Sequence, residues 1–203
     1  MNVTSHDRVR SLSDRLRSGV PAPVSQELLS LPWRPVGGEC LLAARSVAVT
    51  ARRFAQCTVV ANGDRWTGYQ LSLWVSGTVG STAIIELRDT PASCLEIAIG
   101  KSSVSVNQRL GRTWYRLRNV RASVPSTVET LPPSERPPPL IGSGEIGVAI
   151  GLSGRMLSLR VQDIVITQQL SAQVGNGLIS FGMAGPGKSA RVTFSQVAVV
   201  RNS

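Results

Sequence analysis

Few residues in this sequence have side chains that could do chemistry, and their spacing argues against an enzyme. The single histidine, His6, lies near the start of the chain, before the region whose pattern predicts a folded core. A Ser-His-Asp or Cys-His arrangement would require this residue to dock against that core. The three cysteines, Cys40, Cys57 and Cys94, lack metal-binding spacing, and we expect the last two to be small buried side chains. We therefore expect no catalytic residue, no metal and no cofactor.

Paired carboxylates and phosphate-binding loops are also missing in the form that their chemistry needs. The nearest approach to a glycosidase acid pair, Glu86-Leu87-Arg88-Asp89, lacks a second acid on the same strand face. The loops hold single acids, such as Asp64 and Asp163, rather than the clustered oxygens of a calcium site. Gly185-Pro186-Gly187-Lys188-Ser189 lacks the spacing of a phosphate loop and lies between predicted strands, so we interpret it as a turn.

Arginine is the abundant residue whose chemistry points to a partner. The chain carries 22 basic and 12 acidic residues, a formal net charge of +10, and only Lys101 and Lys188 are lysines. A guanidinium group is a planar donor fork for carboxylate or phosphate, and a large positive charge favours polyanions without proving that one binds. Arginine enrichment can equally reflect the base composition of a genome, so both interpretations stay open.

Basic residues gather between residues 101 and 121, a stretch that contains no acid. A strand over residues 114 to 120 would place Trp114, Arg116 and Arg118 on one face, opposite Tyr115 and Leu117. An aromatic ring beside two guanidinium groups suits an anionic ligand, a sugar or a stacked base. We therefore predict a ligand or partner contact surface, which also includes an outward-facing tryptophan on another strand: Trp74, Arg112, Trp114, Arg116, Arg118 and Arg121.

A purely structural explanation of these residues also stays open. Trp114 would then pack beneath a loop, and Trp74 would be covered by the N-terminal segment. Glu86, Glu96 or Glu145 on neighbouring strands would pair with the arginines in ordinary cross-strand fashion.

A period of two in the apolar residues predicts the elements that position this surface. Short runs alternate between apolar and polar residues from residue 69 onward, and turn signals such as Ser153-Gly154 separate them. The phase slips at Ser195-Gln196, which predicts a β-bulge. Many short strands, each with one apolar face, indicate a β-sandwich. The residues expected to point between its sheets are Leu71, Leu73, Ile85, Leu87, Ile97, Leu117, Val148, Leu159, Phe181 and Phe194.

Two segments depart from this period. Residues 1–37 form a proline-rich N-terminal arm in which helical spacing predicts a short helix over about residues 6 to 18. Residues 38–203 form the sandwich, interrupted by a proline-rich loop over residues 122–144. No apolar run reaches the length of about 18 residues that a membrane-spanning helix needs, and no secretory signal core is present. We expect a cytoplasmic chain or one associated with a virion or other assembly.

The order and spacing of several segments resemble a known superfamily. Gly111–Leu117, Gly154–Asp163, Gly177–Gly182 and Ala190–Val199 are similar to strands and hairpins of laminin-G-like domains. Over about residues 38 to 200, the pattern resembles the concanavalin A-like lectin/glucanase jelly roll. The resemblance implies two antiparallel sheets, packed face to face, one of them concave. The sequence departs from the pattern at Gln162-Asp163, where the family has glycine, and it lacks the acid-rich strand of catalytic members.

These observations predict an all-β protein, an antiparallel two-sheet jelly-roll sandwich with a short helical or irregular N-terminal arm. The first functional hypothesis is a non-catalytic binding module that contacts a glycan or a protein partner, although an aromatic content of 4% is low for sugar stacking. The second is a structural or assembly subunit, such as a viral coat, decoration or scaffold protein, which predicts homo-oligomers. The third is binding of nucleic acid or another polyanion through the arginine-rich face, which predicts strong salt dependence.

Overall fold

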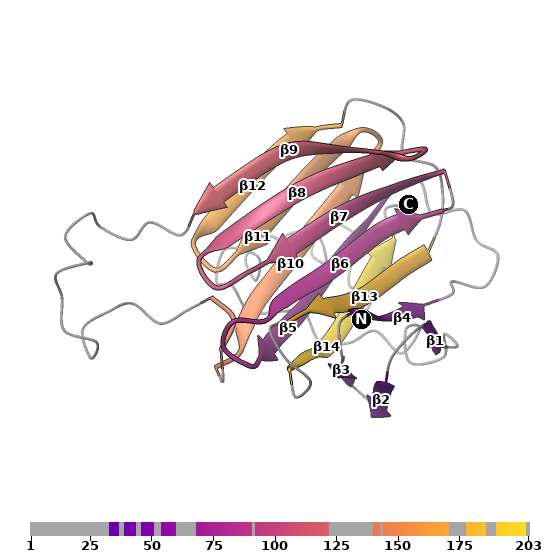
Figure 1. Cartoon of the computed structure of the whole chain (residues 1–203). Coiled ribbons are helices and arrows are strands. Elements are labelled where there is room, and N and C mark those ends of the chain that lie inside the picture. The colour runs from indigo at the N-terminus through magenta and orange to yellow at the C-terminus, as the bar shows by residue number, and fades with distance from the viewer. Residues whose placement is uncertain are drawn as a thin grey trace, which may run out of the picture.

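The computed structural model describes residues 33–36, 39–43, 46–50, 54–59, 68–90, 92–121, 140–142, 144–170, 178–185 and 190–201. These residues form strands and turns, arranged as two antiparallel sheets that pack face to face (Figure 1). This arrangement confirms the predicted all-β sandwich. Sheet A has the order β1 (Trp33–Val36), β4 (Phe54–Val59), β13 (Leu178–Ala184), β6 (Thr82–Asp89), β7 (Ser93–Ile99), β8 (Ser103–Leu110) and β9 (Thr113–Arg121). Sheet B has the order β12 (Ile164–Gln169), β11 (Met156–Val161), β10 (Ile146–Ser153), β5 (Gly68–Gly77), β14 (Arg191–Arg201), β3 (Ser46–Thr50) and β2 (Glu39–Ala43).

Local hairpins build one half of each sheet and the β2–β3 edge of sheet B, and long-range pairs join the remaining strands. Strands β6 to β9 pair in sequence order, as do β10 to β12. In contrast, β5 lies between β10 and β14, and β13 lies between β4 and β6. Strands β9 and β12 are therefore edge strands of opposite sheets, and they lie side by side at one rim of the sandwich (Figure 1).

Apolar side chains from both sheets fill the space between them. The residues predicted to point inward are all buried except Leu117, which is partly buried and packs against the core. Phe181 of β13 and Phe194 of β14 are fully buried, and their ring centroids lie 4.8 Å apart. The end of the proline-rich loop returns to the core, where Leu140 and Ile141 are buried.

Turns and a bulge follow the sequence signals closely. The predicted bulge is confirmed, because the register of β14 against β5 shifts between Ser195 and Ala198, and Gln196 has a φ of 49°. Gly154 lies in the turn between β10 and β11 with a φ of 54°, a left-handed conformation that glycine adopts readily. The next turn uses Gln162 at a φ of 50°, a left-handed conformation that glycine adopts more easily.

The start of the sandwich differs from the prediction. Strand β1 belongs to sheet A, although it lies within the residues predicted as the N-terminal arm. Its Pro35 is compatible with this position because an edge strand needs only one side of its backbone for pairing. The predicted helix, His6 and most of the loop over residues 122–144 lie outside the described residues. No helix in the described part of the chain is long and apolar enough to cross a membrane.

Candidate functional site

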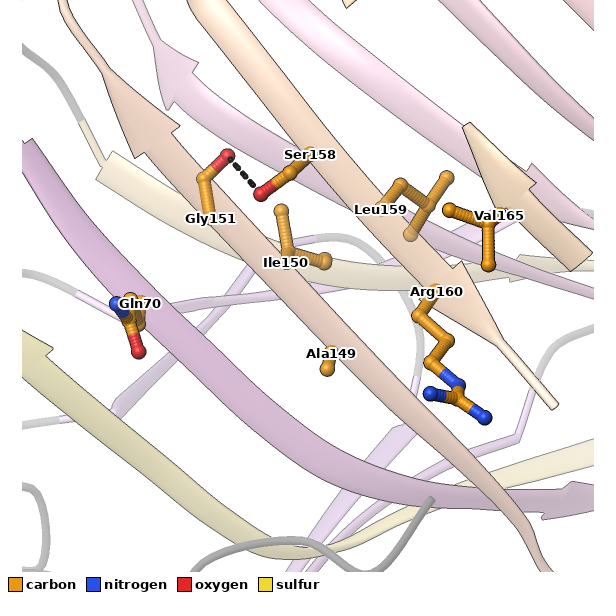
Figure 2. Close-up of a pocket in the computed structure, with 8 residues that line it drawn as sticks. All are labelled: Gln70, Ala149, Ile150, Gly151, Ser158, Leu159, Arg160 and Val165. Carbon is orange, nitrogen blue, oxygen red and sulfur yellow. Dashed lines mark hydrogen bonds between the residues drawn. The ribbon is translucent and has the colours of Figure 1, made fainter. Parts of the chain in front are cut away.

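The outer face of sheet B carries a hollow with a volume of about 230 Å³ (Figure 2). Residues of β5, β10, β11 and β12 line it: Gln70, Ala149, Ile150, Gly151, Ser158, Leu159, Arg160 and Val165. At about 30 Å³ for each water molecule, the hollow holds the volume of roughly eight waters. It is smaller than the range of about 300–1,000 Å³ typical of pockets for drug-sized ligands, so it suits one small ring.

Small side chains on the central strand β10 make the floor of this hollow. Ile150 faces the core, whereas Ala149 and Gly151 on either side of it face outward. Gly151 lies opposite Gln70 of β5 on one side and opposite Ser158 of β11 on the other. A Cβ atom at Gly151 would collide with the hydroxyl of Ser158. Glycine at this position therefore lets the hydroxyl of Ser158 keep its present orientation beside the hollow.

Polar groups with spare hydrogen-bonding capacity border the hollow. The Oε1 atom of Gln70 is buried and accepts no hydrogen bond. The hydroxyl of Ser158 donates to the carbonyl oxygen of Gly151 at 3.5 Å, which is long for such a bond (Figure 2). Arg160 donates from Nε to the carbonyl oxygen of Gln162 at 3.1 Å, which leaves its terminal nitrogens as further donors. A ligand in the hollow would meet an amide, a hydroxyl and a guanidinium group.

Trp74 lies on the same outer face as the hollow but outside it. Its partners across the strands are Gly147 of β10 and Ser195 of β14, and its side chain is partly buried. Four residues of extended chain separate it from Gln70, about 13 Å at 3.3 Å per residue. The other predicted contact residues are on or beside β9 in sheet A. The structure therefore divides the predicted surface between two sheets, and a contact role for Trp74 stays a prediction.

Four arginines at the edge of sheet A form a surface that we call the basic rim: Arg112, Arg116, Arg118 and Arg121. Arg112 lies in the turn before β9, the others lie on β9, and all four are exposed. In the described part of the chain, none of the four forms an ion pair. Arg118 donates from Nε to Oε1 of Gln168 on β12 at 3.0 Å, which links the two edge strands.

The prediction that Trp114, Arg116 and Arg118 share one face of β9 is wrong. A further β-bulge, which the alternation of residues does not predict, makes Leu117 an extra residue in β9. The two arginines consequently lie opposite consecutive residues of β8 and face opposite sides of sheet A. Arg116 lies on the same side of sheet A as Trp114, and Arg118 is directed toward β12. The bulge has no sequence signal, because Leu117 between two arginines fits a regular alternation.

Two neighbouring aromatic side chains on β9 are half-exposed, Trp114 at 49% and Tyr115 at 48%. Arg109 of β8 lies opposite Trp114, and its guanidinium carbon is 5.7 Å from the centroid of the indole ring. This is a cation–π contact, in which the guanidinium lies over the indole ring while about half of the Trp114 side chain stays exposed. The expectation that Trp114 packs beneath a loop is therefore wrong.

The acids considered as partners of the arginines have other contacts. Glu96 accepts a hydrogen bond from Nδ2 of Asn107 at 2.7 Å, and Glu145 accepts one from the hydroxyl of Ser195 at 3.0 Å. Glu86 lies directly opposite Glu96, but it is only 8% exposed, so the two carboxylates are not presented together to a glycosidic bond. No group of three potential metal ligands occurs among the residues that the structure describes.

Comparison with known proteins relates the chain to others by structure. No protein-family model matches the sequence, and no curated protein sequence is significantly similar to it. The carbohydrate-binding module CBM66 from Bacillus subtilis superposes with a TM-score of 0.62 at 8% identity, covering 84% of this chain and 96% of that one. The botulinum neurotoxin serotype D binding domain gives 0.59 at 13% identity, covering 90% of this chain and 46% of that one.

A third similar structure is a protein of unknown function with a galectin-like fold from Bacillus subtilis. It has a TM-score of 0.57 at 10% identity, with 89% of this chain and 93% of that one covered. At these identities the likeness establishes the fold alone. The chain has a jelly-roll-related β-sandwich fold, which it shares with a carbohydrate-binding module and with a galectin-like protein.

Proposed function

We propose that this chain is a non-catalytic carbohydrate-binding module of the concanavalin A-like superfamily, and that the hollow of sheet B binds one sugar ring. The observation that carries the proposal is a hollow of one-ring size bordered by polar groups with unused hydrogen-bonding capacity. Each sugar hydroxyl both donates and accepts a hydrogen bond. Arg160 supplies donors, Ser158 supplies a donor or an acceptor, and Gln70 lines the hollow with a side-chain amide whose Oε1 atom is buried and has no partner.

The fold supports this proposal in a second way. A carbohydrate-binding module from Bacillus subtilis has the same overall arrangement, so a sandwich of this kind can serve sugar binding without an active site. The described residues lack a metal-ligand cluster, and their one opposed carboxylate pair is mostly buried. Both features are consistent with binding rather than catalysis.

The hollow predicts weak binding of a single ring. No aromatic side chain is among its lining residues, so stacking does not contribute. A hexose has about 12 non-hydrogen atoms, and at about 0.3 kcal/mol for each atom the binding free energy is about 4 kcal/mol, a millimolar Kd. Longer oligosaccharides would bind more tightly only through contacts outside the hollow.

The test is a screen of the full chain against a glycan array, followed by calorimetric titration of each glycan that binds. Gln70→Ala should weaken binding about 2- to 10-fold, the range for one neutral hydrogen bond. Arg160→Ala should weaken it about tenfold or more, because a charged donor is lost. Gln169→Ala is the matched control, since Gln169 is an exposed glutamine on the same face of sheet B but outside the hollow.

Two results would contradict the proposal. One is a folded chain that binds no neutral or charged glycan at millimolar concentrations. The other is a glycan whose affinity is unchanged by Gln70→Ala and Arg160→Ala, which would place its site elsewhere on the sandwich.

A further inference from the structure

We propose that the basic rim binds an acidic polysaccharide whose carboxylate groups pair with Arg116, Arg118 and Arg121. This inference rests on the proposed function and extends it from one sugar ring in the hollow to a charged chain at the neighbouring edge. It assigns a ligand class to a surface whose contact role the sequence could only suggest.

The first argument is uncompensated charge. The four arginines of the basic rim are exposed, and within the described part of the chain they have no ion-pair partner. Residues 97 to 128 contain no acid that could neutralise them locally. Arg116 and Arg118 face opposite sides of sheet A, so the edge strand presents positive charge on both of its sides. An anionic ligand would compensate this charge.

The second argument separates a ligand surface from simple protection of an edge strand. Charged residues on an edge strand hinder pairing with other chains, and this role alone would explain several arginines. It does not explain Trp114 and Tyr115, which expose about half of their surface beside the same arginines. The contact of Arg109 with the indole also fixes Trp114 as a platform that a sugar ring could stack against.

The third argument selects a polysaccharide over a peptide or a nucleic acid. A peptide added as a further strand of sheet A would need a regular edge, and the bulge at Leu117 interrupts the ladder of β9. Single-stranded nucleic acid is held by several aromatic rings along a groove, whereas Trp114 and Tyr115 lie on opposite sides of an edge strand. A polyuronate needs fewer aromatic contacts, because the carboxylates along its length can pair with arginines on either side of the edge.

The fourth argument is continuity with the hollow. Arg118 contacts Gln168 on the inward-facing side of β12, and Val165 on the outward-facing side of the same strand lines the hollow. Because β12 is the edge strand of sheet B and lies beside β9 (Figure 1), one chain could occupy the hollow and pass over this edge to the basic rim. From Arg112 to Arg121 the extended backbone spans about 30 Å, which is long enough for several sugar units. The planar carboxylate of a uronic acid matches the guanidinium fork.

The experiment compares a polyuronate with its methyl ester of equal length, because esterification removes the charge and keeps the chain. Calorimetric titration of the full-length protein in dilute buffer should give a Kd on the order of tenfold lower for the acid form, and the difference should shrink as salt is added. The triple variant Arg116→Ser, Arg118→Ser, Arg121→Ser should remove this difference.

The single variants Arg116→Ser and Arg191→Ser form a matched pair, since Arg191 is an exposed arginine of β14 outside the basic rim. Of these two single variants, only Arg116→Ser should weaken binding of the polyuronate.

The outcomes separate this inference from the proposed function. Equal affinity for acid and ester, with a loss in Gln70→Ala, overturns the rim site and leaves the hollow standing. Binding of the acid that depends on the basic rim, without binding of any neutral sugar, supports the rim site and overturns the hollow. Oligo(dT) or poly-glutamate binding as tightly as the polyuronate overturns the assignment to a polysaccharide. An unchanged Kd in the triple variant overturns the rim site altogether.

Discussion

The contact between Phe181 and Phe194 joins the two sheets, and its removal is a sharp test of the packing. Both rings are fully buried, with centroids 4.8 Å apart and ring planes inclined by 31°. A buried phenylalanine removes about 150–250 Å² from water, which at about 25 cal/mol per Å² corresponds to roughly 4–6 kcal/mol. Alanine retains part of this burial. We expect Phe194→Ala to lower the free energy of unfolding by about 3–5 kcal/mol, and Phe181→Ala by a similar amount.

Urea unfolding followed by circular dichroism and tryptophan fluorescence measures these losses. The double variant completes a mutant cycle, in which the coupling should be about 0.5–1.5 kcal/mol, the contribution of an aromatic pair beyond its buried area. Phe194→Leu is the control, because it preserves most of the volume and should cost less than the alanine variant. If the double alanine variant does not fold, the corresponding leucine variants give the cycle. Losses below about 1 kcal/mol in both single variants, or strict additivity, would refute this contact between the sheets.

Three further predictions concern other positions, the first two measured by the same urea unfolding. Leu73→Ala should cost about 2–5 kcal/mol, and Leu117→Ala clearly less, because Leu117 is only partly buried at its bulge; equal costs would contradict the described packing. Gly154→Ala should lower the unfolding free energy by about 1 kcal/mol and Gln162→Gly should leave it equal or raise it, since both residues have positive φ; a stabilising alanine would be inconsistent with that turn. With the other two cysteines replaced by alanine, the fully buried thiol of Cys94 should react with a thiol reagent only after unfolding, and rapid reaction of the folded protein would show that it is accessible.

Local pattern in the sequence determined the strands and the direction of most side chains. Alternation of apolar and polar residues identifies which face of a strand is buried, and this property needs no knowledge of the partner strand. It correctly predicts the burial of residues as distant as Leu71 and Phe194, and the slip at Ser195-Gln196 correctly predicts a bulge. Turn chemistry at Ser153-Gly154 is equally local, because glycine adopts a left-handed conformation without a steric penalty.

Only the tertiary structure decided which strands are neighbours, and with that the candidate site. The hollow combines Gln70 with Gly151, Ser158 and Arg160, residues that meet because β5 pairs with β10 over a long sequence separation. Its one local signal is the pair of small outward-facing residues, Ala149 and Gly151, which alternation alone treats as ordinary solvent-facing positions. Pairing partners depend on the energy of the whole sandwich rather than on any single strand, so no window of sequence specifies them.

The basic rim shows the same division within a single strand. The sequence determines that its arginines are concentrated near Trp114 and lack nearby acids. Whether Arg116 and Arg118 face the same side depends on the alignment of β9 with β8, where the bulge at Leu117 separates them. A bulge adds one residue to one strand relative to its partner, so it exists only as a relation between two strands. The tertiary structure therefore turned a predicted one-sided stripe into a charged edge whose arginines face both sides of sheet A.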